Sequence, residues 1–177
     1  MNYAAIKTCD IANGPGVRTS LFVSGCTHHC KGCFQPETWD FSYGEPFTQD
    51  VIDTILHSLE PAYVAGLTLL GGEPFEPANQ PAVAELLRQL RARCPGKNVW
   101  AFTGFLLDRD LLPGRVGDAA LVRQMLDCID VLVDGKFRQE LRDEDLYFRG
   151  SRNQRLIDVQ ASLKANKTVS YRHNPGI

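Results

Sequence analysis

The stretch that decides the fold runs from Ser20 to Cys33 and reads Ser-Leu-Phe-Val-Ser-Gly-Cys-Thr-His-His-Cys-Lys-Gly-Cys. Residues 20–24 predict a strand, and Gly25 lets the chain turn directly into the cysteines. In parallel α/β folds, ligands bind at the carboxyl ends of the strands. A cysteine group that directly follows a strand therefore indicates both the fold class and the place of the functional site.

Strands and amphipathic helices alternate along the rest of the chain. The predicted strands cover residues 66–70, 98–102, 129–133 and 156–159, and the predicted helices cover 48–59, 80–93 and 119–127. Such alternation predicts an α/β fold with a mostly parallel sheet. A complete eight-unit barrel needs roughly 250 residues, and this chain has 177. We therefore expect a partial, open (β/α) barrel, as a single domain over residues 1–160 with a polar C-terminal tail at 161–177.

Charge and hydropathy limit the classes of partner. The chain has 19 Lys and Arg against 21 Asp and Glu, a net charge of -2, which offers no electrostatic basis for binding nucleic acid or an anionic membrane. No apolar run approaches the roughly 20 residues that span a bilayer. The N-terminal residues 1–7 lack the apolar segment of a secretory signal. We expect a cytoplasmic protein with no nucleic-acid or membrane partner.

The cysteines divide into one tight group and three isolated residues. In a reducing compartment, three cysteines within eight residues indicate metal or redox chemistry rather than disulfides. Cys94 and Cys128 stand in apolar contexts, and we interpret them as small core residues. Cys9 remains unassigned.

The group has the spacing C-x3-C-x2-C, formed by Cys26, Cys30 and Cys33. Three thiolates on a short loop can ligate three of the four irons of a [4Fe–4S] cubane. The fourth iron is then open, as a cluster needs if it is to bind a substrate. We predict one such cluster per chain, with these three cysteines as metal ligands and catalytic residues.

A structural zinc site is the alternative, with Cys9, His28 or His29 as the fourth ligand. Structural zinc sites usually pair two short two-ligand motifs. No second pair follows, because His57 and His173 are isolated. We therefore favour the cluster and interpret His28 and His29 as exposed loop residues.

Three more predicted strands end in glycine-rich or polar sequence. These ends are Gly71-Gly72-Glu73-Pro74, Thr103-Gly104 and Asp134-Gly135-Lys136. Because the carboxyl ends of parallel strands meet at one edge of a sheet, a single site can be built from them and the cysteine loop.

The cysteine loop together with Gly71-Gly72-Glu73-Pro74 resembles the radical SAM superfamily. The resemblance implies that the open iron chelates S-adenosylmethionine and that an electron from the cluster cleaves it to methionine and a 5′-deoxyadenosyl radical. It also implies that Gly71, Gly72 and Glu73 contact the methionine amino group. Many members carry an aromatic residue just before the third cysteine, where this chain has Gly32. We expect adenine contacts from the backbone at Gly32 and Cys33 and stacking by Phe34.

Further segments narrow the resemblance. Residues 13–19, Asn-Gly-Pro-Gly-Val-Arg-Thr, resemble the loop of glycyl radical enzyme activases. Residues 21–26, 36–39, 131–137 and 149–154 resemble the activases of anaerobic (class III) ribonucleotide reductases. This implies a radical SAM oxidoreductase that installs a glycyl radical on that reductase and receives its electron from flavodoxin or a similar reductant. By resemblance, Thr103, Asp134 and Lys136 line the cofactor pocket against the ribose and the methionine carboxylate.

Two other enzymatic assignments remain open. The protein partner could be another glycyl radical enzyme, such as pyruvate formate-lyase. The substrate could also be a small molecule, although such enzymes usually have longer chains that enclose it. A short, open barrel favours a protein substrate.

Overall fold

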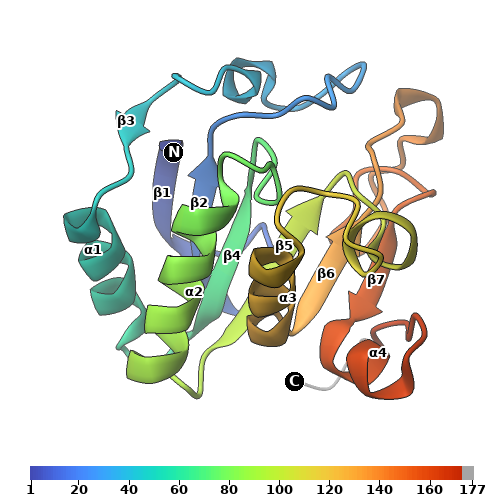
Figure 1. Ribbon diagram of the computed structural model, residues 1–177. Coiled ribbons are helices and arrows are strands. Elements are labelled where there is room, and N and C mark those ends of the chain that lie inside the picture. The colour runs from blue at the N-terminus through green and yellow to red at the C-terminus, as the bar shows by residue number, and fades with distance from the viewer. Residues whose placement is uncertain (173–177) are drawn as a thin grey trace.

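A single seven-stranded sheet forms the centre of the computed structural model, which describes residues 1–172 (Figure 1). Its strand order is β3-β1-β2-β4-β5-β6-β7. The strands are β1 (Asn2–Asp10), β2 (Val17–Val23), β3 (Glu45–Pro46), β4 (Val64–Gly71), β5 (Asn98–Thr103), β6 (Val131–Asp134) and β7 (Arg155–Asp158). All five predicted strands are present, and β1 and β3 are additional.

The predicted helices are also present. They are α1 (Gln49–Leu59), α2 (Gln80–Arg93) and α3 (Ala119–Cys128), and a fourth helix, α4 (Val159–Ala165), follows β7. Short 3₁₀ turns cover Pro36–Trp39 and Gln139–Leu141, and a π-helical turn covers Leu107–Leu111. Helix α3 begins with its Asp118 side chain accepting the N–H groups of Ala120 and Leu121, which would otherwise lack partners.

The sheet is mixed, so the expectation of a mostly parallel sheet holds only for its centre. Strands β2, β4, β5 and β6 are parallel, whereas the pairs β1–β2, β1–β3 and β6–β7 are antiparallel. Parallel neighbours need a long crossover, usually a helix. A short loop, 11–16, joins β1 to β2, and residues 135–154 contain no α-helix. Without a helical crossover, these edge strands pair antiparallel.

Alternating side chains give the sheet two apolar faces with different covers. One face packs under α1, α2 and α3, which all lie on that side (Figure 1), and contributes Leu21, Val23, Leu67, Leu69, Val99, Ala101 and Leu132 to the main core. Cys94 lies in this core and Cys128 packs against it, as expected. The other face carries Phe22, Leu70, Trp100, Phe102, Val131 and Val133. Loops cover this second face, and the candidate site lies there.

The register brings the predicted strand ends together. Val23 lies opposite Gly71, and Thr103 lies opposite Asp134. The cysteine loop therefore starts beside the glycine pair that follows β4.

The described part of the expected tail lies against the sheet. Helix α4 extends to Ala165, Ser170 forms a bridge with Ile157, and the Tyr171 ring lies 5.4 Å from the Trp100 ring. The remaining tail residues, 173–177, lie outside the described residues. Within residues 1–172, no helix combines the length and apolar character needed to cross a bilayer.

Candidate functional site

The cysteine loop leaves β2 through a sharp turn at Gly25. The φ of this residue is +96°, in the left-handed region that favours glycine. The Gly25 N–H donates to the carbonyl of Thr38 at 2.8 Å, and the Cys26 N–H donates to that of Trp39 at 3.2 Å. The 3₁₀ turn at residues 36–39 thus fixes the position of the first cysteine.

Each of the three cysteine sulfurs receives a backbone N–H. The N–H groups of His28 and His29 donate to Cys26, and that of Phe137 donates to Cys30. The Cys33 Sγ accepts the N–H of Gln35 at 3.4 Å. Hydrogen bonds to the ligating sulfurs are one of the means by which proteins tune iron–sulfur clusters. Three thiols on one loop are the type of donor that ligates a [4Fe–4S] cluster, and their role as its ligands stays a prediction.

Backbone hydrogen bonds lower the pKa of a thiol, whereas burial raises it, and for two of these thiols burial has the larger effect. It raises the pKa of Cys26 to about 11, and it also raises the pKa of Cys30. In the metal-free protein these thiols are therefore protonated at neutral pH. Metal binding must release their protons.

The glycine pair after β4 lies in direct contact with the cysteine loop. The Gly72 N–H donates to Val23 O at 2.7 Å, and the Glu73 N–H donates to Gly25 O at 2.9 Å. A Cβ at Gly72 would lie 2.6 Å from that Gly25 oxygen and 2.9 Å from the carbonyl oxygen of Thr38. Glycine is needed here because two backbone segments meet with no room for a side chain.

The Glu73 carboxylate, which is 1% exposed, is bonded entirely within the protein. Oε1 accepts from Phe75 N at 2.9 Å and from Thr103 Oγ1 at 2.8 Å. Oε2 accepts from Gly104 N at 2.7 Å and lies 3.0 Å from His28 Nε2. Glu73 thus links the end of β5 to the cysteine loop.

The expectation that His28 is an exposed loop residue is wrong. Its side chain is 6% exposed, bonds to Glu73, and packs edge-on against the Phe105 ring at 4.5 Å. His29 is an exposed loop residue, as expected, and its ring stacks on Trp39 with ring centroids 4.7 Å apart. Sequence alone could not reveal the His28 contact, because its carboxylate partner lies 45 residues away.

A second carboxylate holds the same loop and was missed by the sequence analysis. Glu76 is 4% exposed, and its Oε1 accepts the Thr27 N–H at 2.7 Å and the Thr27 hydroxyl at 2.6 Å. The available signal was the pair of acids three residues apart in the segment between β4 and α2. Together Glu73 and Glu76 hold both residues that follow Cys26.

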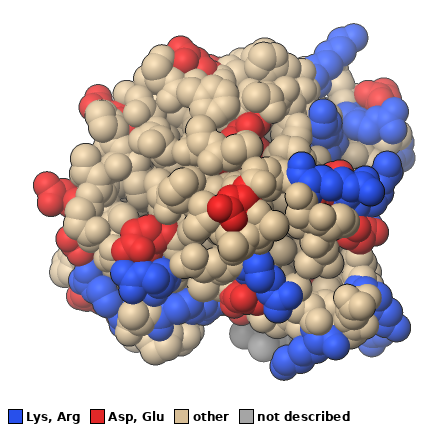
Figure 2. Space-filling view, viewed as in Figure 1, with Lys and Arg blue, Asp and Glu red and all other residues tan. Residues whose placement is uncertain are grey.

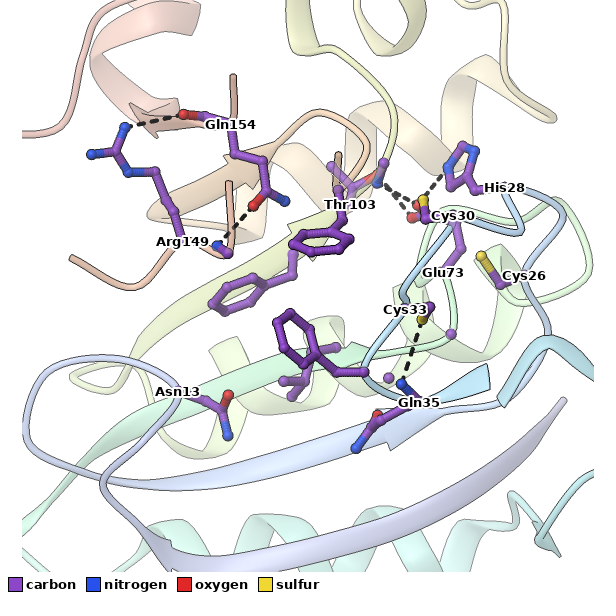
Figure 3. Close-up of a pocket in the computed structure, with 18 of the residues that line it drawn as sticks. Asn13, Cys26, His28, Cys30, Cys33, Gln35, Glu73, Thr103, Arg149 and Gln154 are labelled. Atoms are coloured by element: carbon purple, nitrogen blue, oxygen red, sulfur yellow. Dashed lines mark hydrogen bonds and ion pairs between the residues drawn. The ribbon is translucent and has the colours of Figure 1, made fainter. Parts of the chain in front are cut away.

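A cavity of about 730 Å³ lies on the loop-covered face of the sheet, and the cysteine loop forms part of its lining. Figure 3 shows the three cysteines, Glu73 and Thr103 on one side of the view and Asn13 and Arg149 on the other. Its volume is within the usual range for small-molecule and cofactor sites, about 300–1,000 Å³. Eight of the predicted site residues line it: Cys26, Cys30, Cys33, Phe34, Gly71, Gly72, Glu73 and Thr103.

Three predicted residues lie outside this lining: Gly32, Asp134 and Lys136. Asp134 is fully buried, and its carboxylate accepts from Arg155 Nε at 2.8 Å, from the Arg155 NH2 group at 2.6 Å and from Leu107 N at 2.8 Å. Lys136 and Gly32 are exposed. Their roles in cofactor binding stay predictions.

The apolar wall of the cavity was not predicted as part of the site. It includes Phe22, Leu70, Phe102, Phe137, Tyr147 and Phe148. Phe34 stands at its edge, 63% exposed, 5.1 Å from the Phe137 ring. Alternation along the strands was the available signal for Phe22, Leu70 and Phe102, because it places them on the face away from the helices.

A buried arginine shapes the far end of the cavity. Arg18 is 0% exposed and donates to Thr68 Oγ1 at 2.6 Å, to Leu67 O at 2.8 Å and to Pro15 O at 3.2 Å. Burial lowers its pKa to about 10. The Thr68 hydroxyl in turn donates to Asn13 O at 2.8 Å. This network fixes the loop that brings Asn13 into the lining.

A family model described as "4Fe-4S single cluster domain" matches residues 12–157. The anaerobic ribonucleoside-triphosphate reductase-activating protein of Escherichia coli (strain K12) is 44% identical over 156 residues, which cover 87% of this chain and 96% of that protein. The chain belongs to the anaerobic ribonucleoside-triphosphate reductase-activating protein family. Members from Vibrio cholerae serotype O1 and Enterobacteria phage T4 are 44% and 39% identical and cover 87% and 88% of the chain, with 96% and 93% of their own lengths matched. No solved structure matches the chain significantly.

Membership of this reductase-activating family confirms the resemblance read from the motifs. The match to a 4Fe-4S domain also favours the cluster over a zinc site. Of the alternative fourth zinc ligands, His28 is hydrogen-bonded to Glu73 through its Nε2 atom.

Proposed function

We propose that this protein is a radical SAM enzyme that installs a glycyl radical on an anaerobic ribonucleotide reductase. One observation carries the proposal: the three cysteines open onto the same cavity as Gly71, Gly72 and the end of β5. The names of the relatives, all reductase-activating proteins, support this partner over pyruvate formate-lyase.

Cys26, Cys30 and Cys33 would hold a [4Fe–4S] cluster, and the backbone N–H groups that point at their sulfurs would stabilise the thiolates. When bound and reduced by flavodoxin or a similar donor, the cluster supplies the electron that cleaves S-adenosylmethionine to methionine and a 5′-deoxyadenosyl radical. The chain itself needs no acid or base for this step, because the protein binds and orients the cofactor.

The cavity walls suggest how the cofactor would be held. Because four donors occupy the Glu73 carboxylate, we infer that backbone carbonyls at Gly71 and Gly72 accept from the methionine ammonium. The aromatic wall, with Phe34 at its edge, would contact the adenine. Thr103 would act mainly by holding Glu73, since its hydroxyl donates to that carboxylate.

The fold supports the same assignment. We infer that the four parallel strands, with helices on one face and a cavity on the other, belong to a partial, open (β/α) barrel of the radical SAM type. We propose that this barrel forms a single domain, which extends past residue 160 because α4 runs to Ala165 and Ser170 forms a bridge with Ile157. A cluster with an open iron suits a reducing compartment, which agrees with a cytoplasmic location.

A protein substrate fits the open cavity. A carbon radical must meet its target in contact and away from water. We infer that the reductase completes the cavity by inserting a glycine loop. The hydrogen atom at Cα of that glycine would move to the 5′ carbon of the radical, which leaves a glycyl radical on the reductase and 5′-deoxyadenosine in the cavity.

Mixing the reduced, cluster-loaded protein with S-adenosylmethionine and the reductase tests this proposal. We expect a glycyl radical doublet in the EPR spectrum and faster cofactor cleavage than without the reductase. A reductase with the target glycine changed to alanine is the control and should give no doublet. Activation of pyruvate formate-lyase instead would contradict the named partner, and stimulation by a small metabolite alone would contradict the protein substrate.

A further inference from the structure

A second cavity of about 360 Å³ lies between residues 149–157 and residues 168–171. Three arginines contribute to its lining, Arg149, Arg152 and Arg155. Arg149 and Gln154 line both this cavity and the cysteine-containing one. The two cavities are therefore neighbours that share part of a wall.

Two donors in this wall lack partners among the described residues. They are Arg149 Nε and Thr168 Oγ1, both buried. Arg149 uses one terminal nitrogen, which donates to Gln154 O at 3.1 Å. Figure 3 shows its guanidinium group turned away from the cysteines. A buried donor without an acceptor is costly, so an acceptor in the second cavity would be favourable.

The charge of this region is positive and only partly balanced. Arg155 pairs with Asp134 and Asp108, at 2.6 and 2.7 Å. Within residues 1–172, no carboxylate pairs with Arg149 or Arg152. Residues 149–172 contain six Lys and Arg against one Asp, whereas residues 1–148 contain 13 against 20. Figure 2 shows many Lys and Arg side chains on the side where β7 lies in Figure 1.

We propose that the second cavity binds a carboxylate side chain from an acidic segment of the reductase. This rests on the proposed function, in which the reductase inserts a glycine loop into the neighbouring cavity. Guanidinium groups bind carboxylates with paired, charge-assisted hydrogen bonds. The uneven charge spans a whole segment rather than one residue, which suits a protein surface of opposite charge. The contact would hold the reductase in register while its glycine enters the reaction cavity.

Binding of the reductase to the cluster-loaded protein tests this docking site. The variant is Arg152→Gln, because Arg152 is exposed and lines only the second cavity. Loss of one charge-assisted hydrogen bond weakens binding by about tenfold. We expect that loss, together with a smaller dependence of Kd on ionic strength. Arg149→Gln combined with Arg152→Gln should weaken binding by about a hundredfold.

Arg123→Gln is the matched control, since Arg123 lies on α3 with a 60% exposed side chain. It should bind the reductase as the parent does. Cofactor cleavage without reductase should be unchanged in Arg152→Gln.

Parent-like affinity in both Arg152→Gln and the double variant, while the parent activates the reductase, overturns this inference alone. Binding of inorganic phosphate or ATP that is lost in Arg152→Gln, with unchanged reductase affinity, also overturns it. A parent protein that neither binds nor activates the reductase overturns the proposed function as well.

Discussion

Gly72→Ala should damage the cysteine loop itself, before any effect on cofactor binding. The added Cβ would point at the backbone of that loop, 2.6 Å from Gly25 O and 2.9 Å from Thr38 O. Cβ atoms essentially never approach closer than 3.0 Å, so the Gly25 carbonyl must move by about 0.4 Å or more. That carbonyl accepts the Glu73 N–H, and Gly25 directly precedes Cys26, the first of the proposed cluster ligands.

The free-energy cost follows from these contacts. Overpacking costs about 1–3 kcal/mol, and a weakened backbone hydrogen bond adds about 0.5–1.5 kcal/mol. We expect the free energy of unfolding to fall by about 1.5–4.5 kcal/mol, which lowers Tm by about 3–18 °C in a chain of this size. Reconstitution should give fewer than the four irons expected for a cubane.

Gly96→Ala is the matched control, because a Cβ there has nothing within 4 Å. Its Tm and iron content should equal those of the parent. Thermal unfolding of the metal-free protein and iron and sulfide analysis after anaerobic reconstitution provide the measurements. Parent-like Tm and iron content in Gly72→Ala would refute the reasoning, since the loop would then tolerate the side chain that the geometry excludes.

Three further predictions concern single side chains. Replacing any of the three loop cysteines with alanine should abolish iron binding, whereas Cys94→Ala should retain it, and iron analysis distinguishes the two. Glu73→Ala should lower the free energy of unfolding by about 3–5 kcal/mol, because it leaves the buried His28 and three further donors without an acceptor; a parent-like denaturant midpoint would contradict this. Asp134→Asn should lower stability by about 1–3 kcal/mol through its weakened contact with Arg155, with unchanged S-adenosylmethionine affinity by calorimetry. Loss of affinity in the folded variant would instead support a cofactor role for Asp134.

The centre of the fold could be predicted because local patterns determine it. The apolar strands β4 and β5 and the spacing of apolar residues in α1 and α2 appear directly in the sequence. The edges could not be predicted in the same way. Strand β1 has exposed and half-buried residues without clean alternation, and its pairing with β2 depends on the short loop between them. Whether an edge strand runs parallel depends on the connection rather than on the strand.

The candidate site shows the same division. The cysteines and Gly71-Gly72 were identifiable because their chemistry depends on residue type and spacing. The role of Glu73 was only partly predictable, since its carboxylate contacts depend on His28 and Thr103, which are distant in the sequence. A polar residue after a strand can face a ligand or face the protein. Asp134 faces Arg155, and only the folded chain brings these two residues together.

The attachment of the cysteine loop has a consequence for the rebuilding of a damaged cluster. Glu73, Glu76 and the 3₁₀ turn at residues 36–39 hold this loop by contacts that use none of its three sulfurs. In small zinc domains, by contrast, the metal supplies the folding energy, and chelators unfold the protein. Here the cysteine loop is held in place before any metal binds. When oxygen strips the iron, we expect the protein to keep its shape and to accept a new cluster without refolding.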